Sequence, residues 1–152
     1  MNKNKFELVS EKHRKHPAMK IKTPRRGTSK SAGYDFFAPI GFTVPSKSSK
    51  LVWTDIKCNT NEDEFLQIVV RSSIGIKKSL TMANTIGVID SDYYNNPTND
   101  GNIGICLYNY GDEDVVIEQN ERICQGIFLK YGITVDDNCL EVRDGGIGST
   151  GE

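Results

Sequence analysis

The sequence predicts a single all-β domain. Its 152 residues suit one domain with a real core and are too few for two comfortable ones. No stretch shows the sustained 3.6-residue periodicity of a long amphipathic helix. Short apolar or alternating runs are instead separated by Gly, Pro, Asn, Asp and Ser, which is typical of a sandwich, jelly roll or barrel.

The expected strands follow one another at close spacing along the chain. They cover residues 6–9, 34–38, 42–44, 50–58, 65–70, 81–89, 101–108, 115–117 and 123–131. A short helix is expected over residues 72–78, directly after a strand. Pro97 lies in a polar stretch over residues 95–101, which predicts the tip of a hairpin.

Composition excludes several classes of protein. The 19 basic and 20 acidic residues give a net charge of −1, which argues against a direct nucleic-acid binder. The polar start leads into no long apolar run, so we expect no signal peptide and no membrane span. The four cysteines form no CxxC pair, which favours free thiols in the cytoplasm over zinc ligands or disulfides. His13 and His16 lie in a basic run that we expect to be solvated.

The stretch GVIDSDY, residues 87–93, is the most informative for chemistry. Asp90 and Asp92 follow an apolar run and lie two residues apart, so on a strand they would share a face. A carboxylate at the end of a rigid strand is a candidate general base. The alternative is a pair of solvated turn residues.

Three further stretches could bind an anion or a metal. Arg71 and Ser72 open the expected helix, where they suit either an anion site or an ordinary helix start. Gln125 stands among apolar residues of a strand and needs a partner, either a side chain or a ligand. Asp35 lies at a strand start, where backbone groups or the water shell of a metal could satisfy it.

The C-terminal residues differ from the rest of the chain. Four glycines with Arg143, Ser149 and Thr150 cannot build a core, and they predict a flexible arm whose donors suit a polyphosphate. The alternative is a disordered tail.

Five of these stretches, taken in order, resemble the motifs of the trimeric dUTPase family, the deoxyuridine 5′-triphosphate nucleotidohydrolases. The motifs read AGYDFFA, RSSIGIK, GVIDSDY, ERICQGI and RDGGIGSTG, and they span about residues 31 to 151. The resemblance implies a distorted β jelly roll that forms a homotrimer with shared active sites. It divides the chain into one domain, residues 1–141, and an arm, residues 142–152, that closes over the site.

The implied activity is hydrolysis of dUTP to dUMP and pyrophosphate, which limits uracil in DNA and supplies dUMP for dTMP synthesis. By resemblance Asp90 is the general base that activates a water, and Tyr93 packs on the deoxyribose. Asn84 and the backbone through Gly87 and Ile89 would read the uracil edge.

The resemblance also implies the groups that hold the phosphates. Substrate binding would involve Arg71, Ser72, Ser73 and Gln125, with Arg143, Ser149 and Thr150 of the arm on the γ-phosphate. Arg122 would pair with Asp92 as a structural brace. The triphosphate would chelate Mg²⁺, and Asp35 would reach the ion through water.

Two departures from the family pattern leave alternatives open. Ile147 stands where the family usually has a phenylalanine that stacks on uracil, and residues 95–101 look like an insertion after Tyr93. The alternatives are a dCTP deaminase or bifunctional dCTP deaminase/dUTPase, and a trimeric binding module for a regulatory protein. Neither alternative implies a membrane or nucleic-acid partner.

Overall fold

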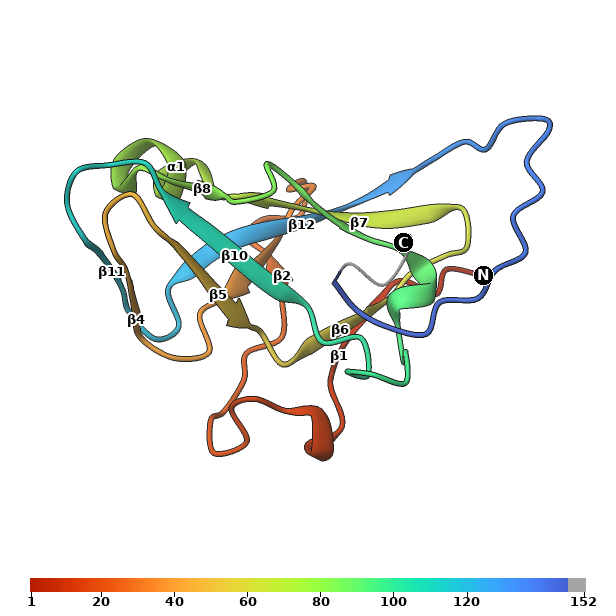
Figure 1. Cartoon of the computed structure of the whole chain (residues 1–152), viewed down its shortest axis with the longest axis horizontal. Helices are drawn as coiled ribbons and strands as arrows, with labels where there is room; N and C mark the ends of the chain where they lie inside the picture. Colours follow the sequence, from red (N-terminus) through yellow and green to blue (C-terminus); the bar gives the residue numbers. More distant parts are fainter. Residues whose placement is uncertain (148–152) are drawn as a thin grey trace.

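The computed structural model describes residues 1–147 and confirms the all-β prediction (Figure 1). Its strands are β1 (Lys5–Leu8), β2 (Arg25–Arg26), β3 (Tyr34–Phe37), β4 (Phe42–Val44), β5 (Ser49–Trp53), β6 (Ile56–Asn59), β7 (Glu64–Val70), β8 (Leu80–Met82), β9 (Gly87–Ile89), β10 (Gly104–Asn109), β11 (Val115–Ile117) and β12 (Arg122–Lys130). The helix α1 (Ser72–Lys78) and two 3₁₀ turns, η1 (Glu11–His13) and η2 (Ser91–Tyr93), complete it.

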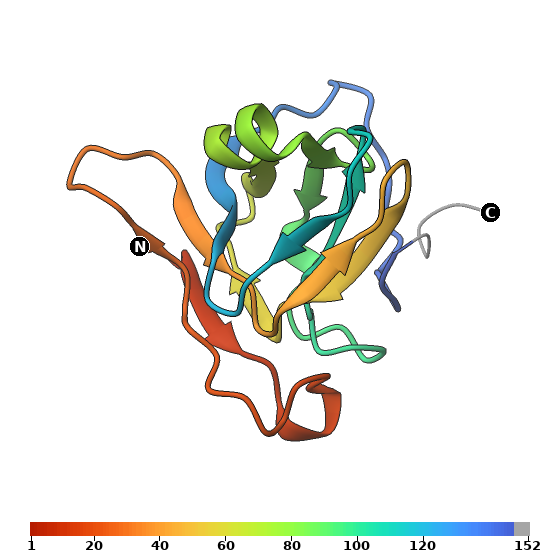
Figure 2. The ribbon, with the colours of Figure 1, turned by 90° about the vertical axis from the view of Figure 1, so that its left-hand side faces the viewer.

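The strands form antiparallel sheets around one core. A five-stranded sheet has the order β2-β3-β12-β7-β9, and a three-stranded sheet has the order β5-β10-β8. The pairs β1-β6 and β11-β4 extend this framework. Figure 2 shows α1 at one end of the strands and the N-terminal segment at the other. The largest fully buried side chains come from both larger sheets and include Phe36, Leu66, Ile68, Ile105 and Leu107.

Two expected strands are each divided by a turn that the alternating pattern did not reveal. The expected strand at 50–58 breaks at Asp55, which has a positive φ of 58°. The expected strand at 81–89 breaks at Thr85, with a φ of 67°. A residue with a positive φ interrupts an extended strand, and such a φ is uncommon for residues other than glycine. The alternation of apolar and polar residues continues across both turns, so the sequence pattern gave no sign of the interruption.

Asp55 also explains the basic run near the N-terminus. Its fully buried carboxylate accepts hydrogen bonds from the backbone N–H groups of Lys15 and His16, each at 2.8 Å. His16 Nε2 lies 3.1 Å from the Trp53 carbonyl oxygen. The prediction of a solvated run was therefore wrong for His16, which helps to attach this segment to the domain.

The helix was predicted with its observed bounds. It ends at Ser79, whose left-handed conformation (φ 54°) lets its N–H bond the carbonyl of Ile74. Strand β2 and the two 3₁₀ turns were not predicted, since two or three residues are too few for a periodic signal.

The register of β7 sets the distance between the predicted site residues. Ile89 of β9 pairs with Leu66, whereas Gln125 of β12 pairs with Val69 near the other end of β7. Arg71 lies five residues beyond Leu66, which is about 17 Å at the rise of a strand. Asp90 and Arg71 therefore lie at opposite ends of β7.

The described residues contain no helix that is long and apolar enough to cross a membrane. The four cysteines are free, as expected. Burial raises the pKa of the Cys58 thiol to about 12, so this thiol stays protonated and unreactive.

Leu66 provides a test of this core, because it is fully buried and supports the register of β9. We expect Leu66→Ala to lower the free energy of unfolding by about 2–5 kcal/mol through lost burial and a cavity. The measurement is denaturant unfolding at a fixed protein concentration. Ile76→Ala also removes three carbon atoms, but from a side chain that is 82% exposed, and it should change stability by less than about 0.5 kcal/mol. Equal losses in the two variants would contradict this account of the core.

Candidate functional site

A cavity of about 500 Å³ collects one group of predicted site residues. We call it the Asp90 cavity; it is lined by Leu51, Ala83, Asn84, Gly87, Val88, Ile89, Asp90, Tyr93, Gly104, Cys106, Arg143, Gly146 and Ile147. The turn after β8, strand β9, turn η2 and the start of β10 form its walls, and the C-terminal segment lies across it. The structure thus brings together seven of the predicted residues: Asn84, Gly87, Ile89, Asp90, Tyr93, Arg143 and Ile147.

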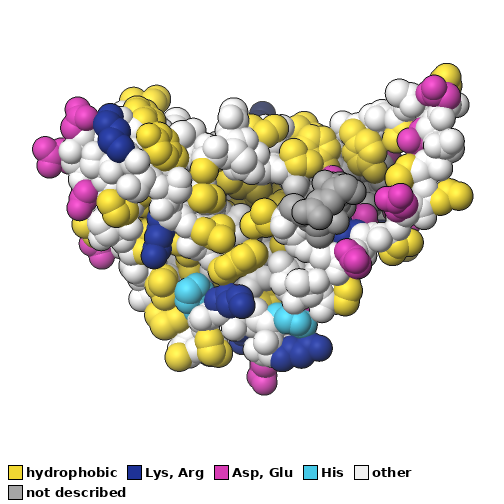
Figure 3. Space-filling model, viewed as in Figure 1, with side chains coloured by type: hydrophobic (Ala, Val, Ile, Leu, Met, Phe, Trp, Pro, Cys, Tyr) yellow, Lys and Arg dark blue, Asp and Glu magenta, His cyan; other side chains and the backbone are white. Residues whose placement is uncertain are grey.

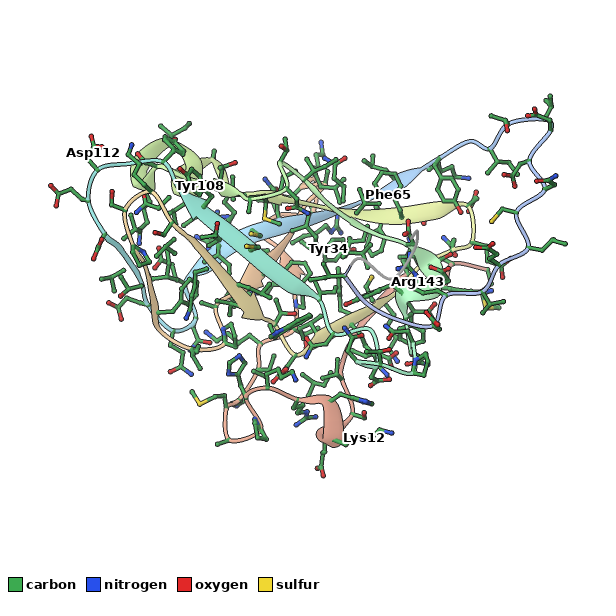
Figure 4. All side chains as sticks on the ribbon, viewed as in Figure 1. Lys12, Tyr34, Phe65, Tyr108, Asp112 and Arg143 are labelled. Atoms are coloured by element: carbon green, nitrogen blue, oxygen red, sulfur yellow. The ribbon has the colours of Figure 1, made fainter. Side chains whose placement is uncertain are left out.

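Asp90 lies where β9 ends and η2 begins, with an extended backbone. Arg143 Nη2 lies 2.6 Å from Asp90 Oδ2, and Arg143 Nε lies 2.8 Å from Asp92 Oδ1. One guanidinium therefore joins both carboxylates of the motif. Figure 4 shows Arg143 beside the helical turn η2, to which the chain returns after leaving β12.

Burial raises the pKa of Asp90 above its usual range. The positive charge of Arg143 opposes this rise, and the negative charge of Asp92 adds to it. A carboxylate with a raised pKa is a stronger base than an exposed one, which suits proton abstraction near neutral pH. The Asp90 side chain is 50% exposed, but it differs from a free turn residue because it pairs with Arg143, whose side chain is only 11% exposed.

A second group of predicted residues surrounds Asp35 at the other end of β7. We call this region the arginine hollow; its two adjoining parts measure about 610 and 370 Å³. They are lined by Arg25, Arg26, Gly27, Thr28, Ser31, Gly33, Asp35, Phe37, Arg71, Ser72, Ser73, Asn120, Glu121, Arg122 and Gln125. Five predicted residues besides Asp35 lie here: Arg71, Ser72, Ser73, Arg122 and Gln125.

Asp35 holds two arginines of this hollow. Arg71 Nε lies 2.9 Å from Asp35 Oδ1, and Arg122 Nη1 lies 3.4 Å from Asp35 Oδ2. The Asp35 side chain is only 11% exposed, so these pairs are partly shielded from water. One carboxylate facing two guanidinium groups leaves a positive charge, which favours an anionic ligand.

A β-bulge places Arg122 in this hollow. The register of β12 against β3 shifts between Arg122 and Cys124. Both Ile123 and Cys124 are consequently buried, and Arg122 lies on the same face of the strand as Gln125. Bulges often redirect a side chain in this way beside a functional site.

Gln125 has space for a ligand beside its side-chain amide. Among the described residues none forms a hydrogen bond with that amide, which faces the arginine hollow. A Cβ on Gly33 would overlap the Gln125 side-chain amide, so that amide would have to shift if Gly33 were replaced by a larger residue. Of the two partners considered for Gln125, a ligand suits this arrangement better than a side chain.

The pair predicted between Arg122 and Asp92 is not formed within the described chain. Arg122 pairs with Asp35 and Asp92 pairs with Arg143, because the bulged start of β12 and the turn η2 lie at different ends of β7. The predicted pair of Arg122 and Asp92 could therefore form only between two copies of the chain, and in that form it remains a prediction. Ser149 and Thr150 lie outside the described residues.

Sequence reasoning missed Arg25 and Arg26, which line the arginine hollow from β2. Arg25 packs over the Phe37 ring at 5.7 Å, and Arg26 over the Tyr34 ring at 5.9 Å. The only signal was the dibasic pair before Gly27-Thr28, which a charge count alone does not separate from a solvated run.

Arg143 offers a test of the electrostatics at Asp90. We expect Arg143→Gln to raise the pKa of Asp90 further, because the positive charge that favours the carboxylate is lost. At a given mildly acidic pH, less Asp90 would then be ionised. The measurement is an NMR titration of the Asp90 carboxyl carbon. Lys47→Gln removes a positive charge that lines neither the Asp90 cavity nor the arginine hollow and should leave the titration unchanged. An unshifted Asp90 in the Arg143 variant would contradict this assignment.

Comparison with known proteins gives a consistent result. Residues 19–151 match the family described as dUTPase. The deoxyuridine 5′-triphosphate nucleotidohydrolase of Lactococcus lactis subsp. lactis is 40% identical over 148 residues, which cover 96% of each chain. The enzyme of the same name from Arabidopsis thaliana is 36% identical, over 84% of this chain and 75% of its own.

A solved structure, the dUTPase from Streptococcus mutans, superposes with a TM-score of 0.72. It is 35% identical and covers 85% of this chain and 97% of its own. The matched region includes both the Asp90 cavity and the arginine hollow. The chain therefore belongs to the dUTPase family.

Proposed function

We propose that this chain hydrolyses dUTP to dUMP and pyrophosphate, with Asp90 as the general base. The observation that carries the proposal is the Asp90 cavity: a carboxylate of raised pKa at the edge of a mainly apolar space that Tyr93 and the backbone of β9 enclose. Membership of the dUTPase family agrees with this activity.

The cavity suits a deoxyuridine. Gly87 is buried, and a Cβ at this position would lie 3.1 Å from Ile68 Cβ, so the backbone itself forms the wall beside the base. Backbone groups and the Asn84 amide offer donors and acceptors for one base edge, and a wrong edge would leave them unpaired. The buried Tyr93 ring would lie against the sugar and exclude a 2′-hydroxyl.

The chemical step needs one proton transfer. Asp90 would take a proton from a water whose oxygen attacks the α-phosphorus in line, while the bond from that phosphorus to the α–β bridging oxygen breaks. The electron pair of that bond leaves with pyrophosphate. Arg143, which pairs with Asp90 here, would move to the γ-phosphate together with Ser149 and Thr150, and Ile147 would cover the base without an aromatic stack.

The arginine hollow would hold the phosphates. Arg71 and Ser72 lie at the start of α1, and Gln125 lies beside them on β12. The net positive charge around Asp35 favours a polyphosphate over a neutral ligand. Ser73 lines the same hollow and would add a hydroxyl donor.

Magnesium would arrive with the nucleotide. The described residues contain no group of three or more His, Cys, Asp or Glu side chains that could bind a metal on their own. Both Asp35 oxygens face arginines, but each retains a lone pair that can accept from a magnesium-bound water. The ion would neutralise charge on the leaving pyrophosphate.

A complete site would need more than one copy of the chain. Asp90 lies one residue beyond Ile89, level with Phe65, so it is six residues from Arg71 along β7, or about 20 Å. This separation is too long for both residues to act at the α-phosphate of one nucleotide. The segment after β12 also projects from its own domain (Figure 1). It exposes Ile133, Val135, Leu140 and Val142, and Figure 3 shows acidic side chains along it. A homotrimer, in which this segment packs on a neighbouring copy, accounts for both features.

The two alternatives have less support. None of the residues that line the Asp90 cavity is a glutamate, so the cavity offers a deaminase no glutamate as acid/base. The loop over residues 95–101 directs Asn96 into its own chain, where that side chain is buried. A regulatory-protein partner therefore remains a prediction without a specific surface. A cytoplasmic location, in which thiols stay reduced, suits the free cysteines.

Asp90→Asn tests the assignment of the base. We expect turnover of dUTP with Mg²⁺ to fall by about 10²–10⁴-fold, because the amide cannot accept the proton. Pyrophosphate release measures turnover, and binding of a non-hydrolysable dUTP analogue should persist. Unchanged turnover would contradict the proposal. For the wild type, dCTP, dTTP and UTP assayed beside dUTP test the base and sugar selectivity, and rapid reaction of dCTP would favour the deaminase alternative.

Mixed oligomers test the sharing of sites. Arg71→Ala and Asp90→Asn should each be almost inactive alone. When differently tagged copies are co-expressed and purified through both tags, about one site in three of each mixed trimer should combine an intact Asp90 with an intact Arg71 from different copies. Activity should therefore return in the mixture. If verified mixed oligomers are no more active than the two parents, each site lies within one copy.

A further inference from the structure

The loop that follows Tyr93 forms a closed network of asparagine side chains. Asn96 is 4% exposed and Asn102 is fully buried, which is unusual for amides in a surface loop. Asn96 Oδ1 accepts from the backbone N–H groups of Thr98 and Asn99 at 3.1 and 3.2 Å. Asn96 Nδ2 donates to the Tyr93 carbonyl at 2.8 Å and to Asn99 Oδ1 at 2.7 Å.

This network ends on the Tyr93 hydroxyl. The hydroxyl donates to the Asn102 carbonyl at 2.6 Å and accepts from Asn99 Nδ2 at 2.8 Å. A phenol held by a donor on one side and an acceptor on the other has one preferred position. The ring above it is 7% exposed and lines the Asp90 cavity.

The loop is attached firmly to the rest of the domain. Lys57 Nζ donates to Asn95 Oδ1 at 2.6 Å and lies 3.0 Å from Asp100 Oδ2. Asp100 also accepts from the Ser10 N–H at 2.7 Å. Gly101 has a φ of 83°, and a Cβ there would lie 2.8 Å from the Tyr93 carbonyl, so the turn closes tightly on Tyr93.

We propose that Asn99 is a positioning residue that sets sugar selectivity by holding the Tyr93 hydroxyl, and that the loop over residues 95–101 exists to support it. The inference rests on the proposed function, in which the Tyr93 ring contacts the deoxyribose. If the Tyr93 ring moved even slightly, it would admit a 2′-hydroxyl or lose contact with the sugar. Asn99 would thus change which nucleotide reacts without touching the nucleotide itself.

Asn99→Asp separates this role from a general structural one. The aspartate keeps an oxygen that can accept from the Gly101 N–H, now at 3.0 Å, but it loses the donor to Tyr93. The phenol would then donate to the new carboxylate and leave the Asn102 carbonyl. We expect the ratio of kcat/KM for dUTP to that for UTP to fall by about 10–100-fold.

Two further variants make the test decisive. Asn95→Asp adds the same charge to the same loop, next to Lys57 and away from the Tyr93 hydroxyl, and should leave the dUTP-to-UTP ratio unchanged. In a Tyr93→Phe background, Asn99→Asp should have no further effect on the ratio, because its target hydroxyl is absent. Thermal unfolding at equal concentration checks that all variants fold.

The outcomes distinguish this inference from the proposed function. If the wild type does not hydrolyse dUTP, the proposed function fails before any variant is needed. If the wild type prefers dUTP and Asn99→Asp slows dUTP and UTP equally, Asn99 is merely structural and the inference is overturned. It is also overturned if the ratio changes as much in the Tyr93→Phe background as in the wild type.

Discussion

The antiparallel pairing of β7 with β9 and β12 constrains everything else in this molecule. Leu66 and Ile68 anchor β7 in the core, and its register places Asp90 near one end of the strand, while Arg71 follows the other end. A rigid strand cannot shorten this separation of about 20 Å. In the proposed function, the Asp90 cavity and the arginine hollow of one chain therefore serve different nucleotides, and each complete site needs a second copy of the chain.

The arginine hollow and the Asp90 cavity have ion pairs with opposite charge balance. In the arginine hollow, one carboxylate (Asp35) faces two arginines, and the excess positive charge favours a polyphosphate. In the Asp90 cavity, one arginine (Arg143) faces two carboxylates, Asp90 and Asp92, which leaves an excess negative charge. In the proposed reaction Arg143 leaves Asp90 and Asp92 and pairs with the γ-phosphate of the nucleotide instead. The base would then be released from its ion pair only when a nucleotide is present to take the arginine.

Most of the fold could be predicted from the sequence, whereas the residues predicted for one nucleotide site lie in two separate regions of the chain. Alternating patterns located the strands, and α1 was predicted with its observed bounds, because these signals are local. The division of two strands could not be predicted, since left-handed residues such as Asp55 depend on distant partners, here Lys15 and His16. The partner of Arg122 depended on a β-bulge, which leaves the residue pattern of a strand almost unchanged.

The proposed role of the loop after Tyr93 follows from the short length of η2, the 3₁₀ turn that contains Tyr93. Turn η2 has three residues, and within it Tyr93 N–H bonds the Asp90 carbonyl at 3.1 Å. So short a 3₁₀ turn does not fix the direction of a large ring by itself. The same backbone hydrogen bond joins Tyr93 to Asp90, the proposed base. A contact that holds Tyr93 in place therefore also restricts the movement of Asp90. The buried asparagines provide that support through hydrogen bonds whose length and direction are specific, whereas apolar packing alone would leave the ring free to slide.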